Sequence, residues 1–276
     1  MPELPEVETI RKTLKKLILN KKITDIEVYW GKIIKHPDDV EHFKHIVINQ
    51  TIHDIKRKGK FLIFELDTDM LVSHLRMEGK YSVSQTGLPR DKHTHVIFNF
   101  TDGTSLNYND VRKFGTMHVF SKADYLTVKP LNQLGPDPFE EDYNLKYLKE
   151  KLLKTTRYIK SALLDQTIIA GLGNIYVDEV LFKAGIHPEK RANTLTTTQI
   201  EAIFNNSYDV LYEAVKQGGT TIRSYVNGDG EMGLFQQELL VYGKEGQPCK
   251  NCGDTIEKFK LSGRGTHICP RCQRKK

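Results

Sequence analysis

The first residues that could do chemistry stand at the start of the sequence, which reads MPELPEVETI. Methionine is normally removed before a small residue such as proline, and its removal would leave Pro2 as a free secondary amine. An N-terminal amine has a pKa near about 8, so part of it is unprotonated and nucleophilic at neutral pH. A plainer interpretation stays open at this point, because Pro5, Glu6 and Glu8 also suit the first turn of a helix.

The second chemical pattern is formed by all four cysteines of the chain, Cys249, Cys252, Cys269 and Cys272. Two residues separate the members of each pair, and sixteen residues lie between the pairs. This spacing is typical of two tight turns that hold four thiolates tetrahedrally around Zn²⁺. The alternative, two disulfides, is disfavoured in a reducing cytoplasm. Because four cysteines leave no open position for a substrate, we predict one structural Zn²⁺.

The net charge of +6 is concentrated in the same segment. Residues 244–276 contain nine Lys or Arg and three Asp or Glu, whereas the preceding 243 residues contain equal numbers of the two kinds. A charged run is usually only a solvated face, but this one coincides with the cysteines and indicates a polyanionic partner. The stretch EKFKLSGRGTHI alternates like a hairpin with residues 262–265 as its tip, and this turn would present Arg264 where it could approach a phosphate closely.

Length and composition limit the class of protein. The 276 residues suffice for two domains, and 38% hydrophobic with 28% charged residues is typical of a folded chain. No apolar run approaches the roughly 20 residues of a membrane span, and the charged start lacks a signal-peptide pattern. We therefore expect a cytoplasmic protein that does not bind membranes.

The elements that position these residues begin with a helix. Apolar residues at Val7, Ile10, Leu14 and Leu17 predict an amphipathic helix that ends near Asn20. Strand-like segments follow, with one helix near PDDVEHFKHI between them: ITDIEVYW, TIHDIKR, KFLIFELD, MLVSHLRM, HVIFNF, SLNYND and TMHVFS. Residues 1–130 are therefore predicted to form a β-rich domain, a sandwich or barrel, with the first helix packed against it.

The composition changes at LNQLGPDPF, residues 131–139, after which the periodicity is helical. Residues 131–217 are predicted to be a helical domain and residues 218–237 a Gly-rich connector. In AGLGNIY, Gly171 and Gly173 suit a tight turn and Asn174 suits an N-cap, so the free N–H groups of the next helix could bind a phosphate. An ordinary corner between two helices fits these residues equally well.

These motifs together resemble one known family. MPELPEVET, DVRKFG at 110–115, LGPDP, GLGNIY and the four-cysteine segment with GRGTH and CPRCQ closely resemble formamidopyrimidine-DNA glycosylases, in order and over essentially the whole chain. The resemblance implies an α+β fold of four parts: an N-terminal β-sandwich with a packed helix (1–130), a helix-two-turn-helix domain (131–217), a lesion-capping loop (218–237) and a zinc finger (238–276). It also implies a bacterial glycosylase and abasic-site lyase of base-excision repair that removes oxidised purines, chiefly 8-oxoguanine and formamidopyrimidines.

The catalytic roles follow from the resemblance. It implies that Pro2 attacks C1′ of the damaged nucleotide and forms an iminium, which acidifies the 2′ proton and permits β- and then δ-elimination of both phosphates. Glu3 would protonate the opening sugar ring. Lys60 would take part in proton transfer and contact the lesion or a phosphate, although its position also suits a solvent-facing charge at the start of a strand. Arg264 would assist the elimination steps.

The DNA contacts follow in the same way. An enzyme that acts on a base must extrude it from the duplex, and the resemblance assigns the filling of the gap to Met77, Arg112 and Phe114. The guanidinium would hydrogen-bond the orphaned partner base and favour cytosine over adenine. Phosphate clamping is implied for a set of four residues, His93, Asn174, Lys258 and Arg264. Lys160 would lie near the lesion.

The predicted partner is thus double-stranded DNA with an oxidised purine opposite cytosine, bound by a monomer that is nucleoid-associated when on DNA. Two alternatives remain. An endonuclease VIII-type enzyme would remove oxidised pyrimidines, but its start typically has Gly where this chain has Leu4, and it lacks a gap-filling triad of this kind. A non-catalytic, zinc-dependent DNA-binding protein would need no free amine at Pro2.

Overall fold

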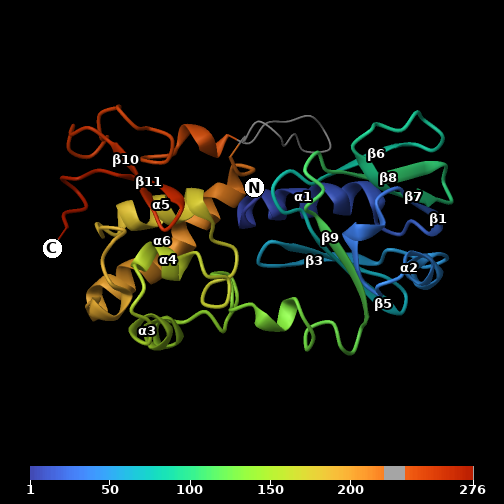
Figure 1. Cartoon of the computed structure of the whole chain (residues 1–276), viewed down its shortest axis with the longest axis horizontal. Coiled ribbons are helices and arrows are strands. Elements are labelled where there is room, and N and C mark those ends of the chain that lie inside the picture. The colour runs from blue at the N-terminus through green and yellow to red at the C-terminus, as the bar shows by residue number, and fades with distance from the viewer. Residues whose placement is uncertain (221–233, 276) are drawn as a thin grey trace. The chain divides into compact units, whose positions relative to one another are not determined.

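The structure, a computed structural model, describes residues 1–220 and 234–275. By their contacts the residues divide into two units, Met1–Asn132 with Thr220–Gly233 and Gln133–Gly219 with Leu234–Lys276 (Figure 1). The four-part division inferred from the sequence stays a prediction. In the part of the chain that is described, no helix is long and apolar enough to cross a bilayer.

The first helix, α1 (Leu4–Ile18), confirms the amphipathic pattern. Its apolar face is buried through Val7, Ile10 and Leu14. Pro5 lies in the first turn, where its missing N–H is not needed. The helix ends two residues before the expected Asn20, which adopts a positive φ of 62° and so cannot continue it.

Two sheets make up the rest of the first unit. The four-stranded sheet is antiparallel, in the order β1 (Ile23–Val28), β7 (Thr94–Phe100), β8 (Thr104–Asn109) and β6 (Lys80–Gln85). The five-stranded sheet has the order β2 (Ile34–His36), β9 (Thr116–Ser121), β5 (Asp69–His74), β4 (Phe61–Glu65) and β3 (Asp54–Lys58), with only β2 and β9 parallel. The 3₁₀ helix η1 (Gly31–Ile33) and α2 (Val40–Val47) connect β1, β2 and β3.

One hydrophobic core joins both sheets to α1. It contains Ile10 of α1, Phe98 of the four-stranded sheet and Phe64 of the five-stranded sheet. The prediction of a β-sandwich with a packed N-terminal helix is therefore confirmed. Strands β2 and β6 were not predicted, because IKH is too short to show alternation and KYSVSQ has only two apolar residues in six.

The second unit is built from helices and one hairpin. Its α-helices are α3 (Leu145–Leu153), α4 (Ile159–Leu163), α5 (Asn174–Lys183) and α6 (Thr197–Lys216), with the short 3₁₀ helices η3 (Ala192–Thr194) and η4 (Phe235–Gln237). The 3₁₀ helix η2 (Leu131–Gln133) lies at the junction of the two units. Helix α5 packs against α4, α6 and the hairpin, so every residue from Ile175 to Phe182 is buried.

The hairpin consists of β10 (Glu257–Leu261) and β11 (Arg264–Ile268). Its two-residue turn places Ser262 at φ 47° and Gly263 at φ 81°, a turn that matches the twist of the flanking strands. The hairpin prediction is confirmed in outline. Arg264 is the first residue of β11 and follows the turn directly, rather than lying within it.

Candidate functional site

The start of the chain is enclosed within the first unit. Pro2 is buried and Glu3 is only 3% exposed. The main-chain N–H of Glu3 donates to Glu6 Oε2 at 2.8 Å, and the other oxygen of Glu6 accepts the N–H of Thr220, also at 2.8 Å. These bonds hold the backbone that directly follows Pro2 and connect it, through Glu6, to Thr220.

Charged side chains surround the terminal amine, which belongs to Met1 in this structure. Burial lowers the pKa of this amine, and the positive charge of Lys60 lowers it further. The negative charges of Glu3, Glu6 and Glu78 oppose these effects and raise the pKa. With Met1 in place the Pro2 nitrogen is an amide and cannot attack. Removal of Met1 would expose a secondary amine to the same charges, in surroundings that favour its neutral, nucleophilic form.

Lys60 lies in the turn between β3 and β4. Two bonds position this turn: Arg57 Nη1 donates to the carbonyl of Gly59 at 3.0 Å, and Arg57 Nε donates to Glu8 of α1 at 3.1 Å. The side chain of Lys60 is 5% exposed. The alternative interpretation of Lys60 as a solvent-facing charge is therefore wrong.

Two loops that carry the predicted gap-filling residues meet at Tyr108. A Cβ atom at Gly79 would lie 2.3 Å from the Tyr108 hydroxyl oxygen, and one at Gly115 would lie 1.7 Å from it. Only glycine permits this close approach, so both loops pack on the same buried ring. The first loop carries Met77 and the second carries Arg112 and Phe114. The structure thus brings the two loops that carry the three residues together at Tyr108.

Asp110 shapes the second loop. Its carboxylate accepts the N–H groups of Arg112 at 3.0 Å, Phe114 at 2.9 Å and Gly115 at 2.8 Å. The ring of Phe114 is held outward and is 51% exposed, with the Arg112 guanidinium carbon 4.7 Å from its centroid. The half-buried His93 lies beside this loop, because its carbonyl accepts the N–H of Asp110 at 2.9 Å. An exposed aromatic ring on a rigid loop suits insertion between bases.

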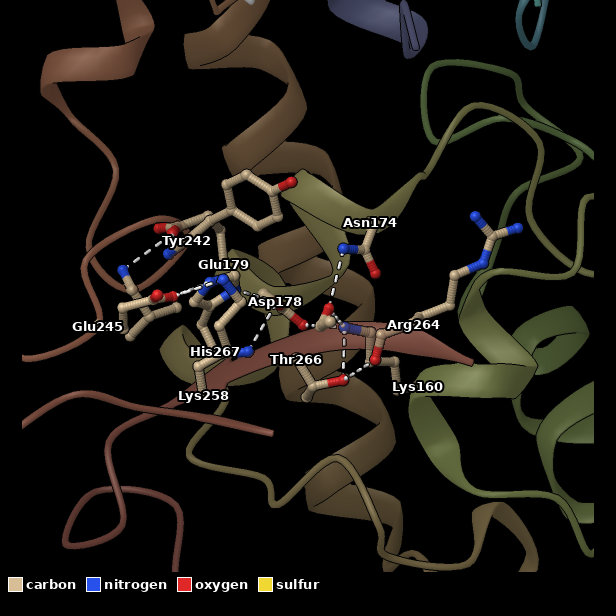
Figure 2. A network of polar contacts seen from close by, with 12 residues as sticks. Lys160, Asn174, Asp178, Glu179, Tyr242, Glu245, Lys258, Arg264, Thr266 and His267 are labelled. Atoms are coloured by element: carbon tan, nitrogen blue, oxygen red, sulfur yellow. Dashed lines mark hydrogen bonds and ion pairs between the residues drawn. The ribbon is translucent and has the colours of Figure 1, made fainter. Parts of the chain in front are cut away.

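In the second unit, Asn174 and the hairpin meet at one carbonyl oxygen (Figure 2). Asn174 Nδ2 donates to the carbonyl of Gly265 at 2.9 Å. The prediction that Asn174 is an N-cap is wrong: Gly173 is the N-cap of α5, Asn174 is its first residue, and the Asn174 amide bonds to the hairpin instead. Arg264, which precedes Gly265, is exposed and points away from the other labelled side chains (Figure 2).

Lys160, which the resemblance places near the lesion, is buried within the second unit. Its side chain is 1% exposed, and its ammonium donates to Asp178 Oδ1 at 2.7 Å, to the Gly265 carbonyl at 2.9 Å and to Thr266 Oγ1 at 2.9 Å. These bonds use all three N–H donors of the ammonium. In this structure Lys160 therefore binds the hairpin and presents no N–H to a DNA strand.

Lys258 is exposed on β10, and its Nζ lies 2.7 Å from Glu245 Oε2. The same carboxylate oxygen lies 3.3 Å from His267 Nε2 (Figure 2). A phosphate bound by Lys258 would compete with Glu245 for the ammonium and could take its place. Because this ion pair is exposed, such an exchange costs little free energy.

The four cysteines form a metal-binding group, as predicted. Their sulfur atoms all lie within 4.8 Å of one another, with Cys249 and Cys272 at 3.9 Å and Cys252 and Cys269 at 3.4 Å. Sulfur atoms bound tetrahedrally at a Zn–S distance of about 2.3 Å lie a little under 4 Å apart, so the group fits Zn²⁺. All four are free thiols rather than disulfides.

Four carboxylates were not assigned a positioning role from the sequence: Glu6, Asp110, Asp178 and Glu179. Asp178 and its neighbour Glu179 lie in a helix whose other residues from Ile175 to Phe182 are apolar or aromatic. Glu179 accepts the N–H groups of Leu240, Val241 and Tyr242, and burial raises the pKa of its carboxyl. Acidic residues within such a hydrophobic run are a signal that could have identified this pair. The predicted capping loop falls largely on residues 221–233, outside the described residues.

Comparison with known protein families assigns three consecutive parts of the chain. Residues 1–117 match the formamidopyrimidine-DNA glycosylase N-terminal domain, and residues 134–226 match the H2TH domain of the same enzymes. Residues 246–274 match the zinc finger found in FPG and IleRS.

Comparison with complete proteins and solved structures identifies the same family. The formamidopyrimidine-DNA glycosylase of Oceanobacillus iheyensis is 59% identical over 99% of this chain and 98% of its own length. That of Bacillus licheniformis is 56% identical over the full length of both. A crystal structure of a Lactococcus lactis FPG mutant with Fapy-dG DNA has a TM-score of 0.94 at 46% identity, covering 99% of this chain and 100% of the other. A structure of MutM with carbocyclic 8-oxo-G DNA has a TM-score of 0.91 at 45% identity, with the same coverage.

Proposed function

Because this chain belongs to the formamidopyrimidine-DNA glycosylase family, we propose that it excises oxidised purines from double-stranded DNA and then cuts the strand at the abasic site. The observation that carries this proposal is the enclosed chain start, where Pro2, Glu3 and Lys60 are buried and burial lowers the pKa of the terminal amine, that of Met1 in this structure. A protein that only binds DNA has no use for such an amine. The relatives solved with Fapy-dG, abasic-site and 8-oxo-G DNA support the substrate class.

The reaction begins once Met1 is removed. The Pro2 nitrogen attacks C1′ of the damaged nucleotide, the sugar ring opens and the base leaves, so that an iminium joins Pro2 to C1′. Glu3 supplies the proton to the ring oxygen, and Lys60 exchanges protons and contacts the lesion or its phosphate. A secondary amine suits this step, because its adduct has no N–H proton to lose and so stays positively charged. The iminium acidifies the 2′ proton, and loss of the 3′ and then the 5′ phosphate follows.

The two loops that pack on Tyr108 extrude the base and fill the gap that it leaves. Phe114 and Met77 enter the stack, and Arg112 hydrogen-bonds the orphaned base, with cytosine preferred over adenine. The exposed ring of Phe114 and the Arg112 guanidinium beside it support this assignment.

The remaining DNA contacts are to phosphates. Arg264, Asn174, Lys258 and His93 clamp the strand around the extruded nucleotide, and Arg264 also assists elimination. The four cysteines that would hold the zinc ion flank the hairpin that carries Arg264 in the sequence. We expect the protein to act as a monomer in the cytoplasm and to be found with the nucleoid when bound to DNA.

Borohydride trapping tests the proposal. The protein, with Met1 removal verified by mass spectrometry, is mixed with duplexes that carry 8-oxoguanine opposite cytosine or an oxidised thymine, and any adduct is mapped. We expect a covalent complex at Pro2, stronger with the purine lesion. Stronger trapping on the thymine lesion would reassign the enzyme to the endonuclease VIII type. Absence of any adduct would leave a non-catalytic DNA-binding protein.

The matched controls change only the terminal amine. Pro2→Gly keeps a primary amine and should keep part of the cleavage activity, whereas protein that retains Met1 should have none. Full activity with Met1 in place would exclude Pro2 as the nucleophile.

A further inference from the structure

The buried pair of Lys160 in α4 and Asp178 in α5 connects these two helices to β11, the strand that begins with Arg264. Both side chains are inaccessible, at 1% and 0% exposure, and lie 2.7 Å apart. Asp178 Oδ2 accepts the N–H of His267 at 2.9 Å, which anchors β11 to α5. The ammonium of Lys160 completes the connection from α4 (Figure 2).

The Gly265 carbonyl is the point where these bonds converge. It accepts Lys160 Nζ at 2.9 Å and Asn174 Nδ2 at 2.9 Å, and so both lone pairs of the oxygen are used. One residue earlier, the carbonyl of Arg264 accepts the Thr266 hydroxyl at 3.2 Å. The main chain on the C-terminal side of Arg264 is therefore held by side chains from α4 and α5.

The side chain of Arg264 itself makes no hydrogen bond or ion pair within the described residues, and Figure 2 shows it pointing away from the network. Because no partner within the described residues holds this side chain, the backbone at Arg264 sets only the point from which it leaves the main chain. A buried charge pair is costly to form, and removal of one partner leaves an unpaired charge in the interior.

We propose that Lys160 and Asp178 are positioning residues, which fix the Gly265 carbonyl and thereby aim Arg264, together with Asn174, at the phosphates of the damaged strand. The proposal rests on the DNA cleavage function proposed above. It assigns Lys160 a role through the hairpin rather than through contact with the lesion, and it assigns Asp178 a part in the same step.

The central experiment separates positioning from folding. Lys160→Met alone leaves the Asp178 carboxylate buried without its cation, and this variant should lose thermal stability. Lys160→Met with Asp178→Asn removes both charges, while the asparagine oxygen can still accept the His267 N–H. We expect this double variant to regain stability and zinc content, but to cleave 8-oxoguanine duplex roughly 10- to 100-fold more slowly than wild type. Recovery of cleavage together with stability would overturn the proposal.

A second set of variants tests whether the buried pair affects DNA binding through Arg264 and Asn174. In a background with Arg264→Ala and Asn174→Ala, removal of the buried pair should change the residual DNA affinity by less than about twofold, and the salt dependence should not change. A direct contact between Lys160 and a phosphate would instead lower the affinity further and reduce the salt slope by about one. That result would overturn the proposal.

Lys183→Met supplies the matched control, because Lys183 is an exposed lysine on α5. It should leave cleavage and stability unchanged. Wild-type protein separates this inference from the proposed function: if the wild type does not cleave, the function fails, and if the wild type and the double variant cleave equally, only the positioning role fails.

Discussion

Glu6 Oε1 accepts two hydrogen bonds from Thr220, one from its N–H at 2.8 Å and one from its hydroxyl at 3.1 Å, across 214 residues of sequence. The other oxygen of the same carboxylate holds the N–H of Glu3. Glu6 therefore joins the residue beside the proposed nucleophile to Thr220.

Glu6→Ala tests this connection. The change leaves the N–H groups of Glu3 and Thr220 unpaired in the interior, and each such group costs about 1–3 kcal/mol. We expect a lower free energy of unfolding in urea and slower trapping on abasic-site DNA. Glu41→Ala, at an exposed helical position, is the control and should change stability by less than about 0.5 kcal/mol. Equal stability of the two variants would contradict the inferred role of Glu6.

Asp110→Ala should loosen the loop that carries Arg112 and Phe114. Three N–H groups lose their acceptor, so the ring and the guanidinium are no longer held outward. The expected result is a smaller ratio of kcat/KM for cytosine over adenine opposite the lesion. Asp102→Ala changes another turn carboxylate, which accepts the N–H of Thr104, and should leave the ratio unchanged. An unchanged ratio in Asp110→Ala would exclude this loop from reading the opposite base.

The pH dependence of trapping should respond to Glu78. The negative charge of Glu78 raises the pKa of the Met1 amine. We expect the same direction for the Pro2 amine once Met1 is removed, so Glu78→Gln should lower the pKa of the nucleophile. The neutral amine then persists to lower pH, and the rising limb of the trapping rate against pH should move to lower pH. Lys60→Met removes a positive charge that lowers the same pKa and should move the limb to higher pH.

The rate on DNA with a preformed abasic site checks this prediction, because base release is bypassed. Glu41→Gln is the control for a change of net charge alone. Shifts of Glu78→Gln and Lys60→Met in the same direction would contradict the charge arrangement around the amine.

Loss of zinc should remove DNA affinity without unfolding the first unit. In Cys249→Ser the four-thiolate site is broken, and Zn²⁺ binding supplies about 10–16 kcal/mol to the folding of such small segments. We expect loss of zinc by metal analysis and weak duplex binding, with the β-sheet signal of the first unit retained. Asn251→Ser, an exposed neighbour, should keep both zinc and affinity. A zinc-free variant that binds at full strength would refute the role of the hairpin.

Local patterns in the sequence were sufficient to predict the metal-binding group, the first helix and the family. The cysteine spacing predicted the metal-binding group, because the ligands of each pair lie within one tight turn. The apolar period of residues 7–17 predicted α1, because burial of one face follows from a repeat of 3.6 residues. Motif order identified the family and, through it, the candidate residues from Pro2 to Arg264.

Only the tertiary structure decided which charged residues lie in the interior and what they hold. Lys60 and Lys160 both suit a surface in the sequence, yet the Glu8–Arg57 contact positions the turn that buries one, and Asp178 with Gly265 encloses the other. Asn174 was expected to cap its own helix and instead bonds a carbonyl 91 residues away. Such contacts depend on where distant strands and helices pack, and no local propensity encodes a partner so far along the chain.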